Sequence, residues 1–282
     1  CYTYLGNMDE QLYCEAMTDN AYTKQPNDAT QNIGNGSYST ADPYVKKVWD
    51  GRYTGIRMCN ELLENIDRVP DLDPELKKRY IGEAKVLRAY NYYELYTKFG
   101  DVPYTTKVLS IKESMSIART AKATVIANVL ADLDEVINGN YLPTSYDADN
   151  KGRITRWAAM AIKAKIYLFE GNWTQVKNIT STIMTEGGFK LFGSYAGLFE
   201  IANEYNSEVI LDAQYRPTSR EHQMMYVFLP PTLGGYSQLS PLQELVDSYI
   251  MLDGKTIKET GTSFDESHPY ANRDPRCLLY TS

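Results

Sequence analysis

Helical periodicity dominates the first two thirds of this chain. Apolar residues recur there at steps of three, four or eight positions, which is typical of amphipathic helices. The predicted helices span residues 43–69, 74–99, 121–138, 155–171 and 172–187. Because short or loop-like breaks separate them, antiparallel helix pairs are the economical packing, and the pattern predicts hairpins like those of tetratricopeptide repeats.

The second of these helices has the clearest boundaries. Asp73 can cap its first turn, and Pro74 suits the first helical position. Gly100 suits the positive φ that commonly follows a last helical turn, and Pro103 prevents the helix from resuming. We interpret this tyrosine-rich helix as scaffold and Asp101 as a turn residue that bonds nearby backbone.

Charged and tryptophan side chains inside the helical patterns are predicted to be structural. For Glu83 and Arg88, an ion pair or a packing role is favoured over catalysis. Trp49 and Trp157 fall within helices and Trp173 stands at a helix start, and we expect all three to pack against neighbouring side chains.

The pattern changes after residue 187. Residues 207–215 indicate a strand or an extended segment, and a short helix is predicted at 242–251. Between them, residues 216–241 are rich in Pro, Gly, Ser and Tyr and show little periodicity, which is typical of a functional or mobile stretch. The predicted fold is therefore mostly α, with helical hairpins as scaffold, long irregular loops and little β.

Composition limits the partners of this fold. The formal charge is −7 and no Lys/Arg cluster appears. This composition argues against electrostatic binding of nucleic acid or anionic lipid and favours a neutral ligand or a protein. No apolar run approaches the roughly 18 residues of a membrane span. Tyrosine is over-represented, with 24 Tyr against 7 Phe and 3 Trp, and a phenol can both stack and hydrogen-bond at a wet surface.

Little in the sequence indicates catalysis, a cofactor or a metal site. Four cysteines are too few and too scattered for a disulfide framework, and neither of the two histidines lies in a nucleophile motif. Residues 147–152 resemble a calcium loop only poorly, because Lys151 takes a ligand position, so a polar loop is favoured. The 36 acidic residues leave a glycosidase carboxylate pair open, but no feature selects one.

A series of short segments matches a known family in order and spacing. The matching segments are Trp49 to Asn60 in the pattern W-x3-Y-x2-I-x2-C-N, Glu83 to Tyr93, Gly100 to Pro103, Arg119, Asp132-Leu133, Leu142-Pro143, Gly152 to Thr155, Ala158 to Trp173, Ser207 to Ile210, Pro241 to Gly254 and Arg273 to Arg276. Together they resemble the SusD/RagB family of outer-membrane nutrient-binding lipoproteins. The resemblance implies a surface protein that captures glycans or peptides, without turnover, for a SusC-like TonB-dependent transporter.

The resemblance also implies how the chain is organised. It implies one SusD-like domain over residues 1–282, a fragment of a longer protein, with a helical scaffold at about 43–190 and a loop-rich ligand portion at about 191–282. A lipid anchor is expected upstream and would place the protein on the outer-membrane surface. The residues after Cys1 look like a helix running into a loop, which favours a mid-chain position for Cys1 over an acylated N-terminus.

Two tyrosine-rich stretches, 19–44 and 216–238, are the predicted ligand loops. A neutral glycan is recognised by aromatic faces flanked by amide, carboxylate and guanidinium groups. The candidate residues are Asp19, Asn20, Tyr22, Asn35, Tyr38, Arg220, Tyr226, Phe228, Tyr236 and Gln238. The alternative is that these tyrosines cover exposed edges of the core.

Three functions follow from the sequence. The leading hypothesis is a non-catalytic surface protein that binds oligosaccharide or polysaccharide and delivers it to the transporter. The second is peptide capture by a member of the same family, for which Tyr38→Ala and Tyr226→Ala would barely alter affinity. The third is a helical glycoside hydrolase, which would release reducing ends from polysaccharide.

Overall fold

The computed structural model describes residues 1–6, 11, 13–24, 29–216, 218–222 and 224–278. They belong to two compact units. The helical unit comprises Cys1–Gly6, Val45–Leu191 and Ser207–Gln214, and the loop-rich unit comprises Asn7–Tyr44, Phe192–Asn206 and Tyr215–Ser282. The single domain inferred from sequence stays a prediction, and parts of the N-terminal helix and of both ligand loops lie outside the described residues.

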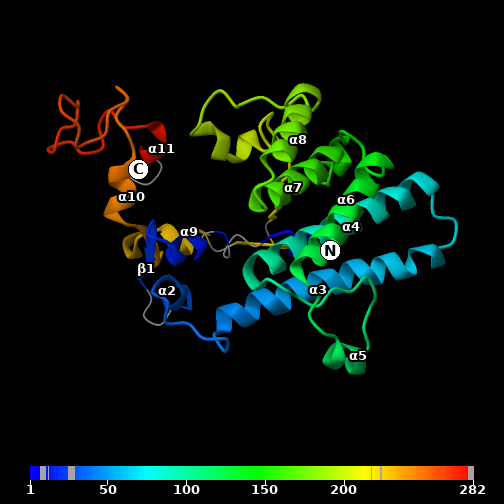
Figure 1. Cartoon of the computed structure of the whole chain (residues 1–282). Helices are drawn as coiled ribbons and strands as arrows, with labels where there is room; N and C mark the ends of the chain where they lie inside the picture. The colour runs from blue at the N-terminus through cyan, green and yellow to red at the C-terminus, as the bar shows by residue number, and fades with distance from the viewer. Residues whose placement is uncertain (7–10, 12, 25–28, 217, 223, 279–282) are drawn as a thin grey trace. The chain divides into compact units, whose positions relative to one another are not determined.

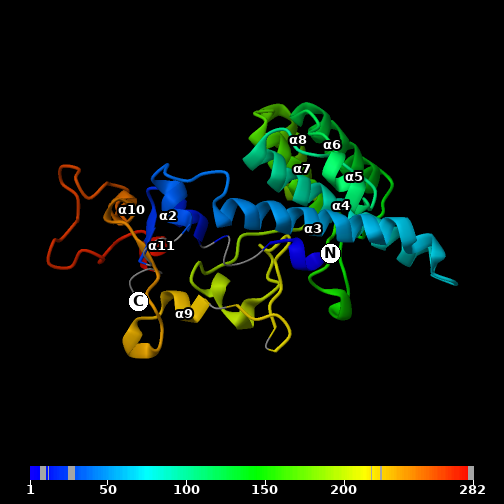
Figure 2. The same ribbon diagram turned by 90° about the horizontal axis from the view of Figure 1, so that it is seen from below.

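The helical unit contains all five helices predicted from periodicity (Figure 1). Its elements are η1 (Tyr2–Tyr4), α3 (Pro43–Asn65, in this unit from Val45), η3 (Ile66–Arg68), α4 (Pro74–Phe99), α5 (Ile111–Ser116), α6 (Lys122–Asn138), η4 (Ala148–Asn150), α7 (Arg156–Phe169) and α8 (Trp173–Glu186). Helix α4 packs on α6, α6 on α7 and α7 on α8. Figure 2 shows this succession of helices from a second side. The mostly helical fold class is confirmed.

The predicted ends of α4 are confirmed in detail. The Asp73 carboxylate accepts a hydrogen bond from the backbone N–H of Leu76 at 2.8 Å, and Pro74 occupies the first turn. Gly100 has a φ of 66°, and its N–H donates to the carbonyl of Tyr96. These local signals decide the helix ends because they act within one turn of the residues that carry them.

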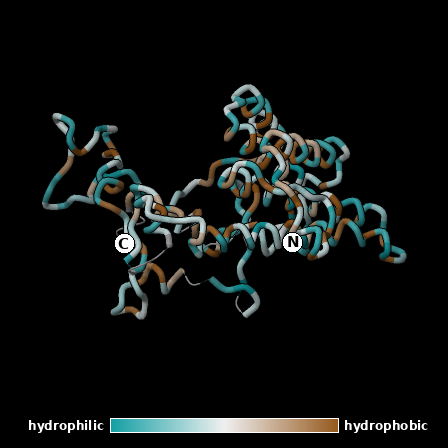
Figure 3. The backbone as a smooth tube through the Cα atoms, turned by 60° about the horizontal axis from the view of Figure 1, so that its bottom comes forward, coloured by the Kyte–Doolittle hydropathy of each residue, from teal (hydrophilic) through white to brown (hydrophobic). Residues whose placement is uncertain are grey.

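The core of the helical unit is built around the tyrosine-rich helix α4. Hydrophobic positions gather where its helices face one another (Figure 3). Tyr92 and Tyr96 are fully buried, as is Cys59 of α3, which behaves as a small apolar residue. Burial of these rings confirms that the tyrosine-rich stretch is scaffold.

One expected core residue is exposed instead. Trp173 has 67% of its surface exposed, so the prediction that it packs is wrong. Ile179 and Ile183 are the buried residues of α8. With 3.6 residues per turn, Trp173 projects roughly a quarter to a third of a turn away from both isoleucines. Trp157 is buried, and Trp49 packs edge-on against Phe99 with ring centroids 5.1 Å apart.

The loop-rich unit has short elements joined by irregular chain. They are η2 (Glu15–Met17), β1 (Ala21–Thr23), α2 (Ala29–Gly34), η5 (Gly197–Phe199), η6 (Ile201–Asn203), α9 (Met224–Phe228), η7 (Pro231–Leu233), β2 (Leu239–Pro241), α10 (Gln243–Ser248) and α11 (Pro275–Leu278). The helix predicted at 242–251 is α10, shorter than expected. Residues 207–214 of the helical unit and Tyr215 of the loop-rich unit form neither helix nor strand, so the strand alternative is wrong, and residues 207–208 lie in a turn.

Candidate functional site

All ten candidate ligand residues lie in the loop-rich unit. A small antiparallel sheet joins the two loops that carry them, with Tyr22 of β1 opposite Ser240 of β2. The pairing continues beyond the strands, because the N–H of Lys24 donates to the carbonyl of Gln238 at 2.7 Å and the N–H of Leu242 to that of Asn20 at 2.8 Å. The structure therefore brings the two predicted loops together through a sheet that the sequence did not indicate.

Alternation along β1 places Tyr22 at the surface. Ala21 and Thr23 are buried, whereas Tyr22 is 55% exposed. Ala21 packs with Val227 and Leu239 in a small apolar cluster beneath the sheet. Tyr22 is therefore held outward by a strand whose other face is anchored.

Tyr226 and Tyr236 form an exposed pair of rings. Their centroids lie 6.3 Å apart with the planes inclined by 38°, and the two residues are 55% and 62% exposed. The N–H of Tyr236 donates to the carbonyl of Tyr226 at 2.7 Å, and the N–H of Gln238 to that of Val227 at 2.7 Å. These bonds fix the spacing of the backbone that carries the two rings and use neither hydroxyl.

A glycine pair makes this close pairing possible. Gly234 has a φ of 84°, a conformation that favours glycine. Gly235 passes so close to Leu229 that an added Cβ would overlap the Leu229 carbonyl. The Gly-Gly sequence therefore returns the chain from α9 tightly enough for Tyr236 to meet Tyr226.

The polar candidates are partly engaged in holding the loops. The Gln238 side-chain oxygen accepts a hydrogen bond from the hydroxyl of Tyr13. The Asn20 amide donates to Glu15 at 2.8 Å, and the Asn35 oxygen accepts from the backbone N–H of Ser37 at 3.0 Å. These contacts stabilise the local shape of the loops.

Arg220 lies in a different local setting from the tyrosine pair. Its guanidinium carbon stands 4.7 Å from the ring centroid of Tyr215, and the Tyr215 ring meets His222 edge-on at 5.3 Å. Sequence reasoning named neither Tyr215 nor His222 as a ligand residue. Their contact comes from a tight turn at 216–220 that no periodic pattern marks.

The remaining candidates are exposed but are not tied to these contacts. Asp19, Asn35 and Tyr38 lie at the surface before and after α2, and Phe228 ends α9. The backbone N–H of Tyr38 donates to the carbonyl of Asn32 at 3.1 Å, which fixes the chain but not the ring. Their place in a ligand site stays a prediction.

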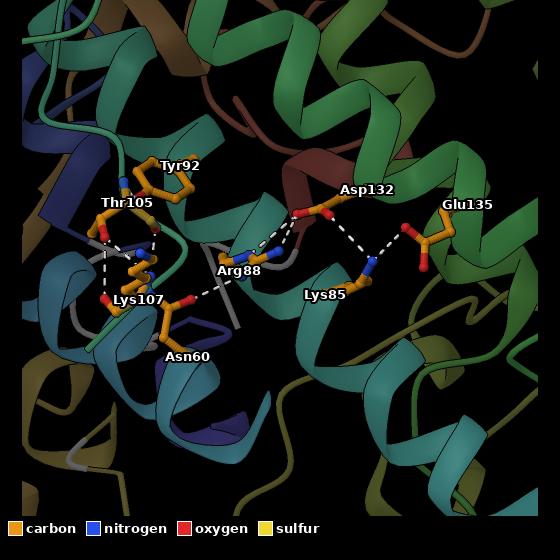
Figure 4. Close-up of polar contacts among 8 residues, drawn as sticks. All are labelled: Asn60, Lys85, Arg88, Tyr92, Thr105, Lys107, Asp132 and Glu135. Carbon is orange, nitrogen blue, oxygen red and sulfur yellow. Dashed lines mark hydrogen bonds and ion pairs between the residues drawn. The ribbon is translucent and has the colours of Figure 1, made fainter. Parts of the chain in front are cut away.

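The buried charges of α4 hold the scaffold together (Figure 4). Arg88 donates to the Asp132 carboxylate at 2.6 Å and to the Asn60 oxygen at 2.9 Å. The Asn60 amide in turn donates to the carbonyls of Thr105 and Lys107 at 3.2 and 3.1 Å. The expected structural role of Arg88 is confirmed, and it connects α3, α4, α6 and the loop after α4.

Glu83 is likewise structural. It is buried and pairs with Arg153 at 3.1 Å and with Arg79 at 3.5 Å. Burial raises the pKa of its carboxyl, and the positive charge of Arg153 partly opposes that rise. Asp101 is structural, but its carboxylate does not make the expected bond to nearby backbone, because it accepts from the N–H of Lys122 at the start of α6, 2.8 Å away.

The described part of the chain contains neither a metal-binding cluster nor a membrane-spanning helix. Among these residues, no three His, Cys, Asp or Glu side chains gather in a way that could hold a metal ion. Asp147 instead caps the turn at 148–150, accepting from the N–H of Asn150 at 3.0 Å. Within the same residues, no helix combines the length and the apolar character needed to cross a membrane.

Comparison with known proteins identifies relatives over most of the chain. Residues 3–168 match a SusD-like family model described as "Starch-binding associating with outer membrane". The SusD-like protein P25 of Formosa agariphila is 32% identical over 212 residues, which cover 73% of this chain and 40% of that protein. The chain thus spans less than half the length of this curated relative.

Solved structures show the same fold. A SusD-like carbohydrate-binding protein of Bacteroides fragilis superposes with a TM-score of 0.87 at 25% identity, covering 95% of this chain and 52% of that one. A laminarin-binding SusD-like protein superposes with a TM-score of 0.68 at 27% identity, covering 74% of this chain and 48% of that one.

Proposed function

The chain belongs to the SusD-like family, and on that premise we propose that it binds glycan at the cell surface without catalysis. The observation that carries the proposal is the exposed pair Tyr226 and Tyr236, fixed by backbone hydrogen bonds in the unit that holds every candidate residue. Two inclined rings with free faces are the arrangement that stacks on the C–H surfaces of successive sugars. The carbohydrate-binding and laminarin-binding relatives support the same ligand class.

Tyr22 extends the proposed surface. It projects from β1, and β1 is hydrogen-bonded to the strand that follows Gln238. Asp19, Asn20 and Gln238 flank these rings along the chain and supply oxygen and amide groups for sugar hydroxyls. We assign the glycan contacts to this sheet and to the α9–β2 return.

Delivery to a partner and placement in the cell complete the proposal. The bound glycan would pass to a SusC-like TonB-dependent transporter, with the protein held at the outer membrane by a lipid anchor. The family description and the curated relative support this assignment. It predicts co-purification of the transporter with the full-length protein from outer membranes.

Calorimetric titration of the purified protein with laminarihexaose, starch oligosaccharides and a wider glycan array tests the ligand class. We expect saturable binding of at least one glycan and no release of reducing ends during incubation. Binding of peptides without any glycan would favour peptide capture and overturn the proposal. Appearance of reducing ends would instead establish a hydrolase.

A further inference from the structure

A second pair of exposed aromatic rings lies in the loop-rich unit. The ring centroids of Tyr195 and Phe199 are 5.4 Å apart with the planes inclined by 76°, an edge-to-face arrangement. The two residues are 42% and 62% exposed. The sequence indicated neither, because both precede the tyrosine-rich stretch at 216–238. Since paired apolar side chains at a surface commonly mark a contact site, the pair indicates a binding surface.

A capped helical turn carries the two rings. The hydroxyl oxygen of Ser194 accepts a hydrogen bond from the backbone N–H of Gly197 at 3.1 Å, and the N–H of Leu198 donates to the Ser194 carbonyl at 3.0 Å. Tyr195 and Phe199 are four positions apart on this turn, so their side chains project from the same side. Local hydrogen bonds therefore fix the backbone on which this pair is mounted.

A charged pair lies near Tyr195. The Nε and one terminal nitrogen of Arg276 donate to the Asp274 carboxylate at 2.9 and 2.6 Å. The pKa of the Arg276 guanidinium is raised, first by these hydrogen bonds and then by the charge of the carboxylate and by nearby tyrosines that include Tyr195. The guanidinium thus lies within electrostatic range of the Tyr195 hydroxyl.

The rings and the charged pair supply the two kinds of contact that a sugar needs. An aromatic ring stacks on the C–H face of a sugar, and a guanidinium beside a carboxylate offers donors and acceptors to neighbouring hydroxyls. The Arg276 side chain is 57% exposed, and its bonds to Asp274 use two of the five N–H groups of a guanidinium. An apolar protein surface would displace water from this charged pair without replacing the lost hydrogen bonds, whereas sugar hydroxyls replace them. The chemistry therefore favours a glycan over an apolar partner.

We propose that Tyr195, Phe199, Asp274 and Arg276 form a second glycan-binding site, in addition to the one at Tyr226. The proposal rests on the proposed glycan-binding function and extends it to a second position in the loop-rich unit. It also gives a binding role to part of the segment that ends at Arg276, to which the family resemblance assigns none.

Calorimetric titration of the whole protein counts the sites. The probes are laminarihexaose, maltohexaose and any array glycan that the wild type binds. We expect two binding events per chain in the wild type. Tyr195→Ala/Phe199→Ala removes the rings of one site, Tyr226→Ala/Tyr236→Ala removes those of the other, and each double variant should keep one event. The variant with all four substitutions should keep none, because separate sites contribute independently.

Arg276→Gln tests the charged pair. In the Tyr226→Ala/Tyr236→Ala background it should weaken the remaining event about tenfold, since it removes hydrogen bonds from a charged donor. Lys258→Gln in the same background is the matched control, because Lys258 is an exposed residue of the same unit outside both sites. Trp173→Ala, which removes a ring exposed to 67% from the helical unit, controls for loss of aromatic surface. Both controls should leave affinity and melting temperature unchanged.

The outcomes separate this proposal from the function on which it rests. A single binding event in the wild type would overturn the second site and leave glycan binding intact. So would two events of which neither responds to Tyr195→Ala/Phe199→Ala. Losses in Lys258→Gln or Trp173→Ala equal to those in the site variants would also overturn the second site, because they would show a general surface effect. Failure of the wild type to bind any glycan would overturn both proposals.

Discussion

The backbone N–H of Tyr236 donates to the carbonyl of Tyr226 at 2.7 Å, and the two exposed rings lie 6.3 Å apart. This relationship ties the spacing of two aromatic faces to main-chain geometry. If both rings contact one glycan, their contributions to affinity should be coupled.

A double-mutant cycle tests this coupling. We expect Tyr226→Ala and Tyr236→Ala each to weaken glycan binding by about 1 kcal/mol, roughly fivefold, because each removes one stacking face. The double variant should lose less binding free energy than the two single variants lose together, because one ring alone cannot orient the ligand. Dissociation constants from calorimetry supply all four corners of the cycle.

Tyr270→Ala is the control for general loss of exposed aromatic surface, since Tyr270 is exposed in the same unit and lies outside β1, β2 and α9. Its affinity should match the wild type. An equal loss of affinity in Tyr270→Ala, or no loss in Tyr226→Ala and Tyr236→Ala, would show that Tyr226 and Tyr236 do not belong to the glycan site.

Local signals explain why the helical unit was predictable from sequence. Asp73 and Gly100 act on their own helix turns, and apolar periodicity over many residues identifies each buried face. The exposure of Trp173 was not predicted, because no periodic apolar residue precedes a side chain at a helix start and indicates which face it lies on. Residue type alone favoured burial.

The loop-rich unit depends on contacts between distant residues. The strands β1 and β2 have three residues each, too few for an alternating pattern to stand out, and they pair across the length of the chain. Tyr13 and Gln238 bond across 225 positions. Exposure of tyrosines in the loops could be predicted from composition, but the pairs they form could not.

Removing only one partner of the ion pair between Arg88 and Asp132 should lower the free energy of unfolding strongly. Asp132→Ala leaves the buried Arg88 without its carboxylate, and we expect a loss of about 3–5 kcal/mol in the free energy of unfolding. Urea denaturation measures it. Asp50→Ala, which breaks the exposed pair with Lys46, should cost less than about 1 kcal/mol. Similar costs for both variants would contradict the structural role of Arg88.

Glu83 should make stability depend on pH. Its pKa is raised by burial above the unfolded value of about 4.3, so the folded chain binds more protons between the two values. Stability contributed by this group is therefore lost as pH rises through that interval. We expect the unfolding free energy of Glu83→Gln, relative to wild type, to increase from about pH 4 toward neutrality.

Unfolding curves at several pH values, with circular dichroism confirming the native state at each, give this difference. A constant offset between Glu83→Gln and wild type would reflect lost hydrogen bonds to Arg153 and would not depend on pH. If the unfolding free energy of Glu83→Gln, relative to wild type, fell as pH rose, the arginines would be lowering the pKa of Glu83, contrary to the expectation.

Two glycines of α3 should respond oppositely to the same substitution. A Cβ at Gly51 meets no atom within 4 Å, so Gly51→Ala should stabilise the chain by about 0.5–1 kcal/mol through helix propensity. A Cβ at Gly55 would lie 2.8 Å from the Cβ of Tyr4 and 2.9 Å from the side-chain oxygen of Asn91. Since Asn91 is fully buried, Gly55→Ala should destabilise by about 1–3 kcal/mol, as overpacking does. Thermal and urea unfolding of the two variants compare them directly, and stabilisation by Gly55→Ala would show that the segment carrying Tyr4 does not pack against α3.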